Sequence, residues 1–264
     1  MYYSLINSMS KTPSVDADVL LFITAASITD TTQKSAINKL VLDLKSASIW
    51  TKMKAIYPFV GGTAAKHRFN LKSPGTTAGD FYLTFYGGDT HSVNGYKPSG
   101  TNGYSDSQLI PSNVLSLNSN GIGYYATEST TSLGDPIQMG ANNSGTQSLI
   151  LASKSTTMFG GANGTNINNS ISGGAGLFSV HRTSSTVTTI YKNNTTINSG
   201  NSGGTLPSTF IYIGTISVNS VPYTSGYVNS EFRFAYISDG LNSTEINSLY
   251  TAVQAYQTTL GRNI

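Results

Sequence analysis

Short apolar runs, separated by clusters of Gly, Asn, Ser and Pro, fill the chain from residue 66 onward. In the first of these runs, apolar residues at 81, 83 and 85 alternate with Tyr82 and Thr84, and a period of two indicates a strand with one buried face. Further runs of this kind occupy residues 114–117, 122–127, 149–152, 177–181, 187–191, 210–213 and 232–237. Because no helical pattern lies between them, the sequence predicts a mainly β, antiparallel sandwich or jelly roll.

Two stretches inside this region, 139–146 and 160–176, are rich in Asn, Gly and Ser. As linkers they would be flexible. Within a strand-rich region they are typical of broad loops, in which Gly and Asn supply residues with positive φ. We therefore expect loops at both places. Neither stretch marks a domain boundary, and no repeat of fixed period is present.

Helical patterns occupy the N-terminal segment, residues 1–60. A first helix is expected around the apolar cluster at 19–23, and Thr29 or Asp30 can cap a second helix. The second helix has the spacing of one buried stripe, with apolar residues at Ile37, Leu40, Val41 and Leu44. Pro58 disfavours helix at the residue before it, so the chain is expected to become extended there.

A further helix is predicted at the C-terminus, over residues 243–259. Asn242 and Glu245 have the spacing of a capping box, with Asn in place of Ser or Thr. Its apolar stripe should pack on the sandwich or on the N-terminal helices, because short isolated helices are marginal in water. The opposite face, which includes Gln254, is polar and uncharged and is expected to face water or another subunit. The predicted organisation is a helical segment 1–60 followed by a sandwich 61–264.

Composition excludes several classes of protein. The chain has 264 residues, no cysteine and a net charge of +3 at pH 7. The absence of cysteine excludes a disulfide scaffold, a zinc-thiolate site and a cysteine nucleophile. A net charge this small does not suggest a nucleic-acid partner. No apolar run reaches the roughly 18 residues of a membrane span, so we expect no membrane insertion, and the N-terminus lacks the features of a signal peptide.

Catalytic and metal-binding patterns are also missing from the sequence. Glycoside hydrolysis needs two carboxyl groups a fixed distance apart. The three glutamates, Glu128, Glu231 and Glu245, lie far apart, and none has an acidic residue two positions away. The three histidines do not have the spacing of metal ligands. We therefore predict a protein that is not an enzyme and has no metal and no cofactor.

Three stretches in the last third of the chain carry a resemblance to a known fold. Residues 176–194 resemble a hairpin of laminin-G-like and concanavalin A-like domains, and residues 210–214 are similar to the next strand. Residues 231–250 resemble the closing strand of such domains and the helix that follows it. The order of the three is the order of the family. The resemblance implies a concanavalin A-like jelly-roll sandwich, with N-terminal helices and a C-terminal helix added to it.

A second resemblance covers most of the chain. Residues 46–62, 67–71, 100–104 and 250–262 are similar to segments of predicted tail and virion proteins of bacteriophages. This implies a non-enzymatic structural protein of a phage particle, made in the host bacterial cytoplasm and located in the virion. It also implies contacts with other virion proteins, which we expect through residues 1–60, and several copies of the chain or a homo-oligomer.

The alternative function is a carbohydrate-binding module that recognises host surface polysaccharide during adsorption. Aromatic rings in polar loops can stack on sugars while neighbouring amides bind hydroxyl groups. The candidate glycan-binding residues are His91, Tyr96, Asn102, Tyr104 and Tyr223. The competing interpretation is that each tyrosine packs on its own loop and bonds its hydroxyl group to the backbone.

Overall fold

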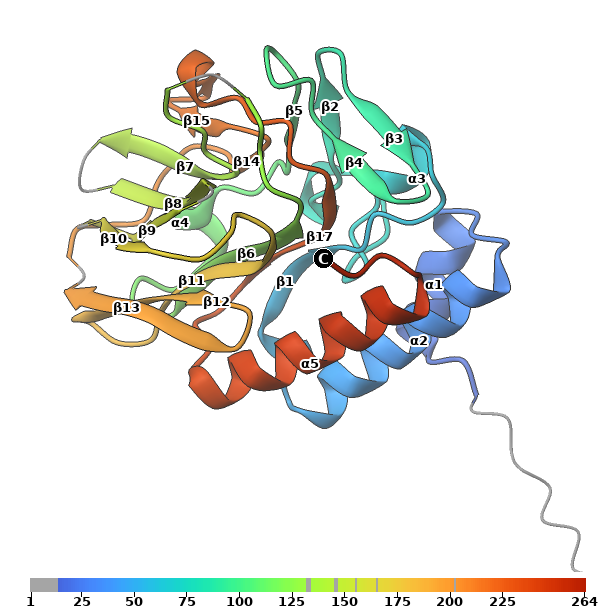
Figure 1. The fold of residues 1–264 in the computed structure, drawn as a ribbon. Helices are drawn as coiled ribbons and strands as arrows, with labels where there is room; N and C mark the ends of the chain where they lie inside the picture. The colour runs from blue at the N-terminus through green and yellow to red at the C-terminus, as the bar shows by residue number, and fades with distance from the viewer. Residues whose placement is uncertain (1–13, 132–133, 145–146, 155, 165, 202) are drawn as a thin grey trace, which may run out of the picture.

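The chain forms three layers, in which two β-sheets face each other and helices cover the outer side of one of them (Figure 1). The computed structural model describes residues 14–131, 134–144, 147–154, 156–164, 166–201 and 203–264. The mainly β, antiparallel sandwich with N-terminal helices and a C-terminal helix is thereby confirmed. One strand pair, β15 (Ile216–Val218) with β7 (Met139–Ser144), is parallel.

We call the sheet beneath the helices the helix-covered sheet. β6 (Asn120–Ala126) lies near its centre, between β11 (Gly176–Arg182) and β17 (Phe232–Ser238), and β1 (Met53–Tyr57) pairs with β17. The other strands of this sheet are β12 (Val187–Lys192) and β13 (Thr195–Asn201) beyond β11, and β4 (Gly95–Lys97) and β3 (Thr90–Ser92) beyond β17.

The second sheet, which we call the open sheet, lies on the far side of the sandwich from the long helices (Figure 1). Its strand order is β10 (Ile167–Ser170), β9 (Thr157–Ala162), β8 (Gln147–Lys154), β7, β14 (Tyr212–Ile213), β5 (Tyr104–Asp106) and β2 (Thr84–Tyr86). The hairpin of β15 and β16 (Val221–Pro222) joins this sheet at β7.

Alternating side chains of both sheets fill the space between them. Leu149 and Leu151 of the open sheet and Val180 and Ile190 of the helix-covered sheet are buried in one core cluster. This is the arrangement expected of two amphipathic sheets packed face to face. Because the inward residues of β8 are those at odd positions, the residues at even positions face outward and are free to form a surface.

A second core cluster joins the helices to the outer side of the helix-covered sheet. α1 (Ala17–Ala25), α2 (Thr31–Ser46) and α5 (Ser243–Thr259) bury their apolar stripes there against outward residues of the sheet, such as Tyr125, Leu177 and Phe234. α2 and α5 lie side by side (Figure 1). Asp30 rather than Thr29 caps α2, and Asn242 and Glu245 form the predicted capping box of α5.

Short helical elements and turns connect the rest: the 3₁₀ segments Trp50–Lys52, Ala78–Asp80 and Thr224–Gly226, and the short helices α3 (Ala64–His67) and α4 (Pro111–Val114). The strand predicted at 114–117 is wrong, because Pro111 stands in the first turn of α4 and starts a helical turn there. Within the predicted helical segment 1–60, residues 53–57 form strand β1 instead of continuing a helix. Residues 1–13 of that segment lie outside the described residues.

The loops predicted at 139–146 and 160–176 are a second correction, since strands β7 and β10 and the end of β9 lie within them. The reason is close packing between neighbours. A Cβ atom on Gly140 would lie 2.6 Å from the carbonyl oxygen of Leu149, and one on Gly160 would lie 2.7 Å from Ile190. Glycine in these strands therefore allows close approach of neighbouring groups rather than a turn. Residues 145–146 and 165 lie outside the described part of the chain.

Candidate functional site

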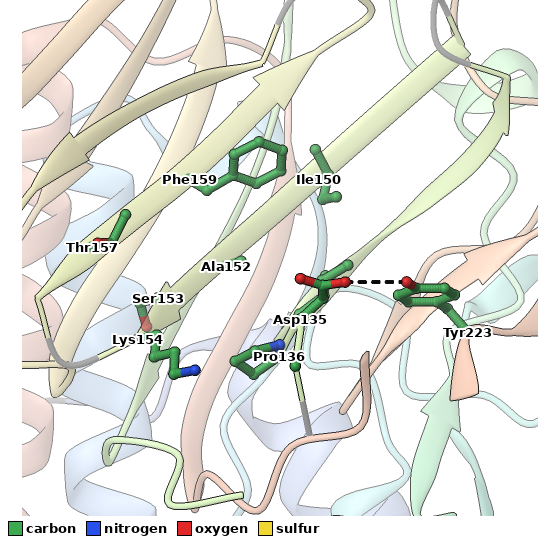
Figure 2. Close-up of a pocket in the computed structure, with 11 residues that line it drawn as sticks. Asp135, Pro136, Ile150, Ala152, Ser153, Lys154, Thr157, Phe159 and Tyr223 are labelled. Carbon is green, nitrogen blue, oxygen red and sulfur yellow. Dashed lines mark hydrogen bonds between the residues drawn. The ribbon is translucent and has the colours of Figure 1, made fainter. Parts of the chain in front are cut away.

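A pocket of about 400 Å³ opens on the outer face of the open sheet. Its floor is formed by β8 and β9, where Ile150, Ala152 and Phe159 point outward (Figure 2). Alternation along the strands explains this floor, because Leu149 and Leu151 take the inward positions. Ligand pockets are typically concave and apolar, with a few polar groups at fixed places, and this pocket has that character.

The wall of the pocket is the segment 134–137, which is held in place from two sides. The backbone N–H of Ile137 donates to the carbonyl oxygen of Gly226 at 2.9 Å. On the other side, the amide of buried Gln138 binds the backbone of Ser153 twice: its Oε1 accepts from the N–H at 2.7 Å and its Nε2 donates to the carbonyl oxygen at 2.6 Å. These bonds fix the wall relative to the floor.

Polar groups stand at the rim of the pocket. The hydroxyl group of Tyr223 donates to Oδ2 of Asp135 at 3.3 Å, so the ring of Tyr223 stands beside the carboxylate (Figure 2). Lys154, the next outward residue after Ala152 on β8, supplies an ammonium group, and Thr157 supplies a hydroxyl group. The rim therefore offers hydrogen-bond acceptors and donors above an apolar floor.

A row of tyrosine rings lies on the same outer face, across β2, β5 and β14. Tyr86 stacks on Tyr104 with ring centroids 4.9 Å apart and an interplanar angle of 15°. Tyr104 in turn contacts Tyr212 at 4.8 Å and Tyr227 at 6.4 Å. The register pairs Tyr86 with Tyr104 directly, which places both side chains on one face of the sheet. We call these four residues the tyrosine row.

The structure places the five candidate glycan-binding residues in separate parts of the fold. Tyr223 lies at the rim of the pocket and Tyr104 lies in the tyrosine row. Asn102 is exposed in the loop before β5, where its Oδ1 accepts from the hydroxyl group of Ser99 at 3.0 Å. Tyr86 and Tyr212 were missed, because only the long-range register brings them beside Tyr104.

His91 and Tyr96 belong to a packed aromatic cluster at the β3–β4 hairpin. Tyr96 is fully buried between Phe59, Phe85 and Phe232, and its hydroxyl group donates to Asp89 at 2.9 Å. The prediction that Tyr96 stacks on a sugar is corrected by this burial, because β4 turns its ring toward the core.

His91 lies on the same cluster and faces a second histidine. The Nδ1 atoms of His91 and His67 are 3.0 Å apart. Burial lowers the pKa of His67 to about 3, assisted by the charge of Arg262, and lowers that of His91 to about 4. Both rings are therefore neutral at pH 7, and one nitrogen of the pair donates to the other. Among the described residues, no group of three or more His, Asp or Glu side chains is placed to hold a metal ion.

No protein-family model matches the chain, and a search of curated proteins finds no similar sequence. In the part of the chain that the structure describes, no helix has the length and apolar character to cross a membrane. Solved structures with a similar fold include binding domains of botulinum neurotoxins.

One neighbour is described as showing that cell entry of botulinum neurotoxin type C depends on interaction with two ganglioside molecules. It has a TM-score of 0.54 and 15% identity, over 79% of this chain and 53% of the other. A binding domain of neurotoxin DC in complex with rat synaptotagmin II has a TM-score of 0.52 and 13% identity, over 78% and 53%. The receptor-binding domain of a C/D mosaic serotype has a TM-score of 0.53 and 10% identity, over 77% and 52%.

These similarities concern the fold: the chain is a β-sandwich of the kind found in those domains. It spans about half the length of the neighbours it matches.

Proposed function

We propose that the chain is a carbohydrate-binding sandwich and that the pocket on the open sheet is its binding site. The observation that carries this proposal is the combination of an apolar floor with a ring, a carboxylate and an ammonium group at the rim, from Tyr223, Asp135 and Lys154. A sugar presents one apolar face of C–H groups and a periphery of hydroxyl groups. The floor and the ring suit the first, and the charged groups suit the second, since hydrogen bonds to charged groups are the stronger ones.

The comparisons support this proposal through the fold. One similar structure belongs to a neurotoxin described as interacting with two ganglioside molecules, which carry sugars, and another is a binding domain in complex with rat synaptotagmin II.

Binding without hydrolysis is part of the proposal. A glycoside hydrolase places two carboxyl groups on either side of the scissile bond. Among the described residues that line the pocket, Asp135 alone is acidic. Glu231 forms an ion pair with Arg233 at 2.9 Å, and Glu245 caps α5 and pairs with Lys52 at 2.5 Å, so both have structural partners.

The assignment to a bacteriophage virion stays a prediction from sequence resemblance, as do the contacts of residues 1–60 with other virion proteins and the multicopy state. A host surface polysaccharide is the ligand that fits both the predicted location in a virion and the proposed binding pocket. The helices cover one side of the sandwich and the pocket opens on the other. One chain can therefore be held by its helical side while the open sheet meets a glycan.

The test is a glycan array that includes bacterial surface polysaccharides, followed by calorimetric titration with the best ligand. We expect Asp135→Asn and Tyr223→Ala to weaken binding by about tenfold each, the value of one good hydrogen bond or ring contact. Asp43→Asn, which changes a partly exposed carboxylate that pairs with Lys39 on α2, far from the pocket, is the matched control and should bind like the parent. Absence of any glycan signal, or equal binding by all variants, would contradict the proposal.

A further inference from the structure

The tyrosine row lies on the sheet that the helices leave uncovered. Tyr86 is 44% exposed at the edge strand β2, and Tyr104 is half-buried beside it. Their hydroxyl groups form no hydrogen bond with another described residue, whereas the hydroxyl of Tyr212 donates to the carbonyl oxygen of Ser220 at 3.1 Å. Two stacked rings thus keep free donors at the surface, which core packing does not require.

A carboxylate lies within this row. Asp106 follows Tyr104 by two residues on β5, so both side chains lie on the same face, and it pairs in register with Tyr212 and with Thr84. Burial raises the pKa of Asp106 to about 6, although its Oδ1 accepts the backbone N–H of Gln108 at 2.7 Å. No ion pair joins it to a Lys or Arg of the described residues. The row therefore combines ring surface, hydroxyl donors and an acceptor with spare capacity.

The row and the pocket belong to one face of the open sheet. Tyr212 pairs with Gly140 of β7, and Gly140 pairs with Ile150 in the pocket floor, so the side chains of Tyr212 and Ile150 lie on the same face of the sheet. The strand order from β8 to β2 has four steps, which at strand spacing is roughly 19 Å. The segment 223–227 also connects the two, because Tyr223 lines the pocket and Tyr227 contacts Tyr104.

From this juxtaposition we propose that the tyrosine row is a second subsite, and that the ligand is a neutral polysaccharide that lies across the open sheet from the pocket to Tyr86. The inference rests on the proposed function of the pocket and names its ligand class. A distance of several sugar units separates the two places, so a monosaccharide occupies the pocket alone. Asp106 and Asp135 both face the path of the ligand, against the single positive charge of Lys154 at the pocket rim, and this excess of negative charge disfavours a polyanionic chain.

The experiment is a titration with neutral oligosaccharides of the cellulose, maltose and chitin series, each from the disaccharide to the hexasaccharide. Hyaluronan oligosaccharides of matched length serve as the anionic comparison. For the series that binds, affinity should rise with length, by about tenfold from the shortest to the longest member, the value of one ring contact. Tyr86→Ala should abolish this gain and leave the affinity for the disaccharide unchanged.

Two variants complete the design. Tyr86→Phe keeps the ring and should retain most of the gain with length, and Leu42→Ala, an exposed apolar truncation on α2, should bind every oligosaccharide like the parent. Since Tyr86 lies at a sheet edge, its variants should melt close to the parent, which a thermal scan checks.

The possible failures are distinguishable. If the parent binds all lengths equally, or if Tyr86→Ala weakens short and long ligands alike, the second subsite is refuted while the pocket stands. Stronger binding of hyaluronan than of neutral chains refutes the ligand class. If no oligosaccharide or array glycan binds, the proposed function fails and the subsite fails with it.

Discussion

His181 and Tyr236 are joined inside the helix-covered sheet, where Nε2 of the imidazole lies 2.9 Å from the phenolic oxygen. Nδ1 of His181 accepts the backbone N–H of Leu241 at 3.1 Å, so the ring proton is on Nε2 and is donated to Tyr236. The side chain is fully buried, and burial lowers the pKa of His181 to about 3, with a smaller contribution from the charge of Lys52. This neutral histidine ties β11 to β17 and to the start of α5.

Replacement of His181 by Phe should destabilise the fold and remove part of its acid sensitivity. The change leaves the N–H of Leu241 and the hydroxyl group of Tyr236 without partners, at about 1–3 kcal/mol for each group. The folded pKa of about 3 is below the ordinary 6.5, so the stability from His181 is present above pH 6.5 and is lost as the pH falls toward 3. Urea unfolding of parent and variant across this range measures both effects. If the variant had the parent's free energy of unfolding at neutral pH, the hydrogen bonds of His181 to Leu241 and Tyr236 would be contradicted.

Two glycines of β6 make room for this pair. Gly121 lies opposite His181 and Gly123 opposite Tyr236 in the register of the sheet. A Cβ atom would lie 2.1 Å from Nδ1 of His181 in the first case and 2.3 Å from the ring of Tyr236 in the second. Gly121→Ala and Gly123→Ala should each cost about 1–3 kcal/mol, because neither ring can move without losing its bond. Gly79→Ala, with no atom within 4 Å of the new Cβ, is the matched control and should leave stability nearly unchanged.

The sequence predicted the arrangement of strands and helices better than the surface they create. Alternation along β2 or β14 shows that each strand has two faces, but the contact of Tyr86 with Tyr104 and of Tyr104 with Tyr212 depends on pairing between distant segments. Tyr96 illustrates the opposite error. It follows an Asn-Gly turn and looks like a loop residue, yet β4 turns it into the core. Burial is decided by which strand lies opposite, and local sequence does not contain that information.

Asp89 should make the protein less stable at alkaline pH. Burial raises the pKa of Asp89 to about 7, although the hydroxyl group of Tyr96 donates to it. Since the folded pKa exceeds the ordinary 3.8, the folded state binds the proton more tightly, and the stability this provides is lost as the pH rises from 3.8 through about 7. The neighbouring histidines His67 and His91 titrate below pH 6.5 with the opposite sign.

Asp89→Asn isolates this effect because the amide oxygen can still accept from Tyr96 and the side chain carries no charge. We expect its melting temperature to exceed that of the parent at about pH 8 and to approach it near pH 4. Thermal scans of both proteins across this interval measure the difference. If the difference in melting temperature between the two proteins were the same at every pH, Asp89 would be ionised with an ordinary pKa in the folded state.

The docking of α5 on the sheet should account for a large part of the stability of the chain. Leu249 is fully buried in the core that joins the helices to the helix-covered sheet, so Leu249→Ala should cost about 2–5 kcal/mol. Gln254 is partly exposed on the polar face that was expected to meet water or another subunit, but its Oε1 also accepts from the hydroxyl group of Tyr125 at 3.3 Å. Thr251, exposed on the same helix, is therefore the better control, and Thr251→Ala should change the free energy of unfolding little. If Leu249→Ala unfolded at the same urea concentration as the parent, α5 would not be docked on the sandwich in solution, and its apolar stripe would be available to another subunit.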